Sequence, residues 1–172
     1  MDQTITKAVL ADAAALNRLV NSAYRGDSSK QGWTTEAYLL DGTRIDEAAV
    51  AELLDNPNTT ILKYSAGSTI LGCVELREEK SKLYLGMLSV APNTQGKGIG
   101  KKLMAAAEDH AKSFGIDAIF MTVISVRKEL IDWYVRHGYQ LTGERKPFVV
   151  PDTRWGIPKQ ELEFVVLEKK LI

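Results

Sequence analysis

The sequence predicts one domain, over residues 1–172, of mixed α/β (α+β) fold. Its length suits one hydrophobic core and leaves little room for a second domain. Segments of strand-like apolar pattern are interleaved with segments whose apolar residues recur at helical spacing. The chain contains no repeat, low-complexity tract or Pro/Gly/Ser-rich linker. The expected order is strand, two helices, three strands, helix, strand, helix and two strands, which indicates helices packed on a mixed sheet.

The first half of the chain contains two predicted helices and an irregular stretch between them. A short edge strand is expected over residues 5–10, followed by a helix over 12–23 that Asp12 can begin. A second helix is expected over 46–54. Residues 25–44 lack periodicity, and a loop of this length is often functional or holds a short helix of its own.

The second half begins with three strand-like runs separated by short turns, which predicts an antiparallel meander. These runs cover residues 59–65, 69–77 and 84–90. A helix over 99–114 follows, with an apolar face that includes Leu103 and Phe114. The remaining predicted elements are a strand over 118–124, a helix over 129–137, and closing strands over 139–142 and 162–167.

Composition excludes several classes of function. Lys plus Arg and Asp plus Glu number 22 each, so no broad nucleic-acid or membrane-surface footprint is expected. The single cysteine, Cys73, cannot form an internal disulfide; we expect a buried thiol and a cytoplasmic protein. The N-terminus has no signal-peptide pattern, and no apolar run is long enough to span a membrane. The two histidines and Cys73 have no metal-site spacing, so no metal is expected.

The most informative segment is Gln-Gly-Lys-Gly-Ile-Gly-Lys-Lys at residues 95–102, between a predicted strand and an amphipathic helix. Glycines let the backbone N–H groups approach a ligand closely, and a helix N-terminus favours an anion. A pyrophosphate is therefore the expected ligand. The spacing is neither the dinucleotide-binding Gly-x-Gly-x-x-Gly nor a nucleotide-triphosphate loop. The alternative is a tight strand-to-helix turn without a ligand.

This segment resembles the acetyl-CoA loop of the GNAT acetyltransferases, usually written Gln/Arg-x-x-Gly-x-Gly/Ala and matched here by Gln95, Gly98 and Gly100. The run Trp-Tyr-Val-Arg-His-Gly-Tyr at 133–139 resembles the second signature of that family. The resemblance covers most of the chain and is weakest over residues 25–58. It implies a strongly twisted mixed β-sheet flanked by about four helices, with acetyl-CoA in a V-shaped gap between two central strands.

The resemblance also implies roles for individual residues. The backbone of one central strand would pair with the pantetheine arm, and the loop amides would hold the pyrophosphate. By position these residues are Leu88, Ser89 and Val90 on the strand, and Gln95, Gly96, Lys97, Gly98, Ile99, Gly100 and Lys101 in the loop. Many relatives carry a cofactor-contacting asparagine where this chain has Arg127. Either the guanidinium of Arg127 replaces that contact, or the contact is lost.

Tyr134 matches the tyrosine that protonates the leaving thiolate in this family. A phenol with pKa near 10 is protonated at neutral pH and can donate to a thiolate whose reference pKa is about 8.5. Core packing against the sheet is the alternative. For the catalytic base, Glu75 is the first candidate, Glu36 is another, and Tyr84 stands where some relatives carry a glutamate. A chain of water molecules without a single base remains equally open.

The acceptor pocket is expected between two irregular stretches, 25–44 and 145–160, which correspond to its walls in the family. Trp33, Glu36, Tyr84 and Arg154 are the candidate substrate-binding residues. Arg154 and Arg145 would bind a carboxylate-bearing acceptor or form a solvated rim. The aromatic residues would line the pocket or simply plug the end of the sheet.

The predicted function is an acetyl-CoA-dependent N-acetyltransferase that acetylates a primary amine of a small molecule or amino acid by direct attack. Two alternatives stay open: a protein or peptide N-acetyltransferase, and a non-catalytic acyl-CoA-binding sensor. The resemblance also implies a homodimer, because similar proteins often pair or exchange their C-terminal strand.

Overall fold

A computed structural model describes residues 3–25, 29–30, 32, 34–41, 44–148 and 157–171. The strands are β1 (Gln3–Lys7), β2 (Leu40–Asp41), β3 (Thr59–Ala66), β4 (Thr69–Glu79), β5 (Lys82–Val90), β6 (Ala118–Ile124), β7 (Gln140–Pro147), β8 (Ile157–Pro158) and β9 (Glu163–Lys170). The helices are α1 (Ala13–Tyr24), α3 (Glu47–Asp55), α4 (Ile99–Ser113) and α5 (Lys128–Arg136), with short 3-10 turns at Leu10–Asp12 and Pro92–Thr94.

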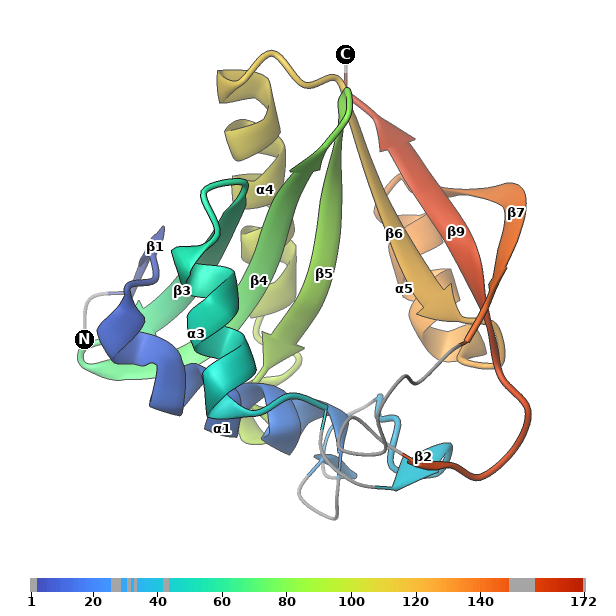
Figure 1. Ribbon diagram of the computed structural model, residues 1–172, viewed down its shortest axis with the longest axis horizontal. Coiled ribbons are helices and arrows are strands. Elements are labelled where there is room, and N and C mark those ends of the chain that lie inside the picture. Colours follow the sequence, from blue (N-terminus) through green and yellow to red (C-terminus); the bar gives the residue numbers. More distant parts are fainter. Residues whose placement is uncertain are drawn as a thin grey trace.

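Seven of these strands form one twisted mixed sheet in the order β1-β3-β4-β5-β6-β9-β7 (Figure 1). Helices α1 and α3 pack on one face, and α4 and α5 lie on the other (Figure 1). The predicted element order and the antiparallel meander β3-β4-β5 are confirmed. The sequence did not predict the second, two-stranded sheet of β2 and β8, whose strands have two residues each.

The central feature of the sheet is the separation of its two parallel neighbours, β5 and β6. They pair only at Leu83 with Ile119 and at Tyr84 with Phe120. Beyond these pairs the strands diverge, and Figure 1 shows a V that opens toward their carboxyl ends. Along the open part of β5 a bulge shifts the register with β4, and Met87 has φ +55°, a left-handed conformation that non-glycine residues rarely adopt.

Two hydrophobic cores hold the layers together, one on each face of the sheet. The larger lies between the sheet and the helices α4 and α5, and Leu103 is fully buried within it. The smaller lies under α1 and α3, around Leu16. The larger core includes residues of β5, β6 and β9 and therefore joins the two arms of the V.

Three local expectations need correction. The first strand ends at Lys7 instead of residue 10, because Asp12 accepts a hydrogen bond from the Val9 N–H at 2.8 Å and turns the chain toward α1. Strands β7 and β9 extend several residues beyond their predicted ends, because they pair with each other. Phe114 follows the last turn of α4 and is 57% exposed. Its ring lies tilted against that of His110, with the ring centres 4.9 Å apart, and does not enter the core.

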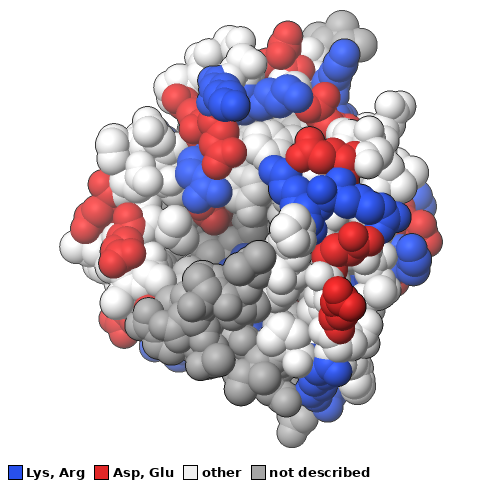
Figure 2. Space-filling model, turned by 45° about the vertical axis from the view of Figure 1, so that its right-hand side comes forward, with Lys and Arg blue, Asp and Glu red and all other residues white. Residues whose placement is uncertain are grey.

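The surface carries charges of both signs. On the face shown in Figure 2, Lys and Arg side chains lie next to Asp and Glu side chains around a central hollow. The totals over the whole chain are equal, at 22 of each sign. Among the described residues, no helix combines the length and the apolar character that crossing a membrane requires.

The buried and exposed apolar residues of α4 give a direct test of this packing. Leu103→Ala should lower the free energy of unfolding by about 2–5 kcal/mol, because it removes a fully buried side chain and leaves a cavity. Phe114→Ala is the control and should change it by about 0.5 kcal/mol or less, since the ring is largely exposed. Urea unfolding measures both, and equal losses would contradict the packing of α4.

Candidate active site

Two cavities occupy the V between β5 and β6, and they meet at a shared wall. One has a volume of about 530 Å³ and lies toward α4 and α5. The other has a volume of about 600 Å³ and lies toward α1, α3 and β9. The residues that line both are Tyr24, Leu88, Arg127, Leu130 and Tyr134. The two cavities can therefore hold two molecules whose reacting groups meet at these side chains.

The cavity toward α4 is bounded by the glycine-rich loop. Gly96 and Gly98 have φ of +87° and +80°, and a β-carbon at either would have no protein atom within 4 Å. Glycine is thus required there by the backbone conformation and not by packing, and the space over both residues is open. The first α4 backbone hydrogen bond runs from Lys102 to Gly98, so the preceding N–H groups have no partner within the helix. An open space against N–H groups at a helix N-terminus favours the binding of an anion.

The structure brings the predicted cofactor residues together along this cavity. Its lining includes Leu88, Ser89, Val90, Gln95, Gly96, Gly98, Ile99, Gly100, Lys101 and Arg127. Lys97 is the exception, because it is exposed and does not line either cavity. The Gln95 side-chain amide donates to the Val90 carbonyl at 3.1 Å, which fixes the loop to the end of β5.

Tyr134 is buried on α5, with 5% of its surface exposed, and it lines both cavities. Within the described part of the chain its hydroxyl makes no hydrogen bond, and it is not one of the fully enclosed polar atoms. Burial raises the pKa of Tyr134 well above its ordinary value. The hydroxyl therefore stays protonated near neutral pH and is accessible at the junction of the two cavities.

Tyr24 shares this junction and was not singled out from the sequence. Its hydroxyl donates to the Leu88 carbonyl at 3.0 Å, and its ring centre lies 5.4 Å from the Arg44 guanidinium and 5.8 Å from that of Arg127. Burial raises the pKa of Tyr24 to about 12, although both guanidinium groups oppose this shift. The only local signal for Tyr24 is its place at the end of the first predicted helix.

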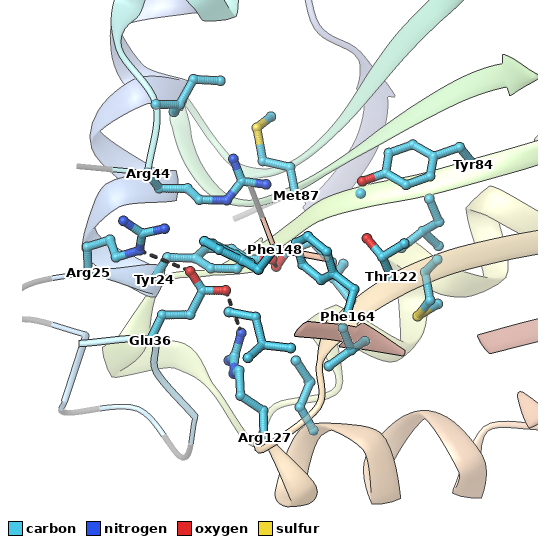
Figure 3. A pocket seen from close by; sticks show the side chains of 18 of the residues that line it. Tyr24, Arg25, Glu36, Arg44, Tyr84, Met87, Thr122, Arg127, Phe148 and Phe164 are labelled. Atoms are coloured by element: carbon cyan, nitrogen blue, oxygen red, sulfur yellow. Dashed lines mark hydrogen bonds and ion pairs between the residues drawn. The ribbon is translucent and has the colours of Figure 1, made fainter. Parts of the chain in front are cut away.

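Glu36 lies at the centre of a buried ionic cluster below Tyr24 (Figure 3). Its Oε1 lies 3.0 Å from Nε of Arg25, and its Oε2 lies 3.0 Å from Nη1 of Arg127. Arg127 also donates from Nη2 to the Thr34 hydroxyl at 2.7 Å. The two guanidinium side chains are 5% exposed and the carboxylate side chain 9%. Arg127 thus fastens the start of α5 to residues 34–36, and two of its guanidinium nitrogens are committed to that contact.

The second cavity combines aromatic, apolar and polar groups (Figure 3). Phe148 and Phe164 stack with ring centres 4.9 Å apart, and Tyr84 and Thr122 point their hydroxyls toward the cavity. Tyr84 lies over Gly86, where a β-carbon would come within 2.8 Å of the Tyr84 hydroxyl oxygen. Of the predicted substrate-binding residues, Glu36 and Tyr84 line this cavity. Trp33 and Arg154 lie outside the described residues.

Glu75 is 6% exposed on β4 and lines neither cavity. It pairs with Gly86 on β5, and the Tyr84 ring covers that residue on the side of the cavity. Burial raises the pKa of Glu75, and Arg77, which donates to its Oε2 at 3.3 Å, opposes the shift only in part. As a base, Glu75 would therefore act through a water molecule beside Tyr84. In the described chain, no cluster of His, Cys, Asp or Glu could hold a metal ion.

Comparisons with known proteins agree with this geometry. Residues 15–139 match the sequence model of the Acetyltransferase (GNAT) family. No curated protein sequence matches the chain significantly. The solved structures described next share less than 25% identity with this chain, so they show that the fold is shared.

Three solved structures illustrate the likeness. The ribosomal-protein-S18-alanine N-acetyltransferase from Escherichia coli is 12% identical, with a TM-score of 0.73 over 99% of this chain and 94% of that one. The PaiA N-acetyltransferase from Thermoplasma acidophilum, solved with coenzyme A, is 21% identical, with a TM-score of 0.71 over 99% of each chain. YncA from Salmonella typhimurium, solved with its cofactor acetyl-CoA, is 22% identical, with a TM-score of 0.70 over 99% and 94%.

The buried ionic cluster gives a prediction for stability. Glu36→Gln should lower the free energy of unfolding by about 3 kcal/mol or more, because it leaves two buried guanidinium groups without their shared counter-charge. Glu79→Gln is the control: Glu79 pairs with Arg77 at the surface, so its loss should cost about 1 kcal/mol or less. Chemical unfolding of both variants measures the difference, and a small effect at Glu36 would show that the cluster does not hold the site together.

Proposed function

Since the chain belongs to the GNAT acetyltransferase family, we propose that it transfers the acetyl group of acetyl-CoA to the primary amine of a small molecule. The observation that carries the proposal is the meeting of two chemically different cavities at Tyr134, which lines both. One cavity offers backbone N–H groups at a helix N-terminus, and the other offers aromatic and charged side chains. The first suits a phosphate-bearing donor and the second suits an acceptor.

The donor side fits acetyl-CoA. The open space over Gly96 and Gly98 and the free N–H groups at the start of α4 suit a pyrophosphate, and Lys101 adds a positive charge beside them. At Leu88, Ser89 and Val90, β5 is not paired with β6, so the edge of β5 that faces the V is open to pair with an amide-containing arm. When bound, acetyl-CoA supplies an activated thioester.

Tyr134 is proposed as the general acid of the transfer. The amine forms a bond to the acetyl carbon while the carbon–sulfur bond breaks, and the sulfur leaves as a thiolate. The raised pKa of Tyr134 keeps a proton on its hydroxyl, and the absence of a hydrogen-bond partner within the described chain leaves that proton free for the thiolate. Solvent then returns a proton to the phenolate.

The acceptor amine must lose a proton before or during its attack, because amines are mostly ammonium at neutral pH. Glu75 stays the predicted base and acts through water, given its place behind Tyr84. Its pKa is raised by burial, which makes it a stronger base than an exposed carboxylate.

A small acceptor is favoured over a peptide by the walls of the second cavity. Residues from α1, α3, β6 and β9 surround it, and Phe148 and Phe164 lie across it. The name of the Escherichia coli neighbour specifies a protein substrate for that enzyme. A protein substrate would need an open groove. A cytoplasmic location and a homodimer stay predictions.

The decisive experiment measures thiol release from acetyl-CoA with pooled amines, namely amino acids, polyamines, aminoglycosides and short peptides. Release with a small-molecule pool supports the proposal. Release with peptides alone would replace the small acceptor by a protein one. If acetyl-CoA raises the melting temperature while no pool reacts, the proposal of an acetyltransferase activity fails. The alternative of a non-catalytic acyl-CoA sensor is then supported.

Tyr134→Phe tests the general acid. It should lower kcat by roughly 10²- to 10⁴-fold, the usual contribution of general acid–base catalysis, while the affinity for acetyl-CoA changes little. Tyr139→Phe is the matched control: its ring lies 5.8 Å from that of Tyr134, and its buried hydroxyl has no partner in the described chain. Equal activity of both variants would contradict the assignment.

Gly98→Ala tests the donor loop. We expect acetyl-CoA binding at least tenfold weaker by calorimetry, because the alanine would strain the loop and place a methyl group in the anion site. Gly115→Ala is the control at the other end of α4, where φ is +69° and a β-carbon likewise meets no protein atom. Both variants should lose similar stability, about 1 kcal/mol, but only Gly98→Ala should lose affinity. Loss of affinity in both would show that strain alone is responsible.

Glu75→Gln tests the base. If Glu75 removes the amine proton, kcat/KM rises with pH as its carboxyl ionises, and burial raises the pKa of that carboxyl. The variant should lose that limb of the profile, and its plateau rate should fall roughly 10²-fold or more. Glu79→Gln, on the exposed end of the same strand, should keep the wild-type profile. An unchanged profile in Glu75→Gln would leave water as the proton acceptor.

A further inference from the structure

Arg44 is a cation in the acceptor cavity, and its guanidinium lies over the Tyr24 ring. Its backbone N–H donates to Asn21, which fixes the chain at this position. Its side chain is partly buried, lines the 600 Å³ cavity and reaches over the Tyr24 ring toward Met87 (Figure 3). Within the described residues, the guanidinium forms no hydrogen bond and no ion pair. Burying a cation without hydrogen bonds is costly, and an anionic ligand would offset that cost.

The acidic neighbours of Arg44 are each held by another arginine. Glu36 uses one carboxylate oxygen for Arg25 and the other for Arg127. Glu75 accepts from Arg77. Both carboxylates attract Arg44 from a distance and favour its charged form, but neither contacts it.

Among the described residues that line the cavity, positive side chains outnumber negative ones. Of these described residues, arginines 25, 44 and 127 line it together with two acidic residues, Glu36 and Glu52. Glu52 is exposed on α3. An anionic group on the acceptor would therefore be attracted to Arg44, the one of these arginines without an ion pair in the described chain.

We propose that Arg44 binds a carboxylate of the acceptor, so that the substrate is an amino acid or a similar amine with an apolar side chain. A guanidinium binds a carboxylate through two parallel hydrogen bonds. This pairing selects a negatively charged group and fixes the orientation of the ligand. Phe148, Phe164 and Met87 offer the apolar surface for its body.

The position of Arg44 also suits the reaction. The ring of Tyr24 lies 5.4 Å from its guanidinium, and Tyr24 forms part of the wall between the two cavities. A carboxylate held at Arg44 thus keeps a neighbouring amine close to the junction, where Tyr134 lies. This inference rests on the proposed function and specifies the chemistry of its acceptor.

The test compares each of the twenty L-amino acids with its α-amide, which keeps the amine and the side chain but lacks the carboxylate. Thiol release gives KM and kcat, and calorimetry with the protein saturated with coenzyme A gives binding without turnover. We expect the acids with apolar side chains to bind roughly 10- to 100-fold more tightly than their amides, as for a charge-assisted pair of hydrogen bonds.

Arg44→Met should abolish this preference and leave the affinity for acetyl-CoA unchanged. Arg44→Lys should keep part of it, because it retains the charge without the paired donors. Arg18→Gln, which removes an exposed positive charge from α1, is the control and should behave as the wild type.

Two results would overturn the inference: amides that bind as well as acids, or a preference for acids that survives in Arg44→Met. Both leave the proposed function intact if any amine is acetylated. If no amine reacts, the proposed function fails, and the calorimetric comparison still decides whether Arg44 binds a carboxylate.

Discussion

The separation of β5 from β6 is the constraint on which the rest of the structure depends. Two parallel strands that pair over only two residues leave backbone groups and a gap in the middle of a sheet. Such a gap is costly in a protein interior, since polar backbone groups need partners. Here Tyr24 satisfies the Leu88 carbonyl. The remaining space forms the two cavities, so the site is a consequence of how the sheet is built.

The second organising feature is the charge cluster around Glu36. A buried carboxylate between two arginines is rarely the most stable solution for a core, but it fixes where its three side chains lie. The cluster joins the end of α1, residues 34–36 and the start of α5. These segments are far apart in the sequence and carry Tyr24 and Tyr134. The cluster therefore holds both tyrosines at the junction of the cavities.

The sequence predicted the parts of the site that are local in the chain. The glycine loop could be identified because its turn, its glycines and the following helix are contiguous, and α4 begins at Ile99 as expected. Tyr24, Arg25 and Arg44 were missed because they border a stretch without periodicity and come together only through the fold. The register bulge at Met87 and the Tyr84 ring over Gly86 likewise depend on strand pairing, which a strand pattern alone does not specify.

The wall that the two cavities share limits how a change of substrate could evolve. Tyr24, Leu88, Arg127, Leu130 and Tyr134 face both cavities, so a substitution at any of them alters the donor side together with the acceptor side. Phe148, Phe164, Tyr84 and Arg44 face the acceptor cavity alone. Divergence in this lineage, or selection in the laboratory, has room to vary these four positions while the donor requirement stays fixed. The shape of the gap thus separates the residues that are free to diversify from those that are not.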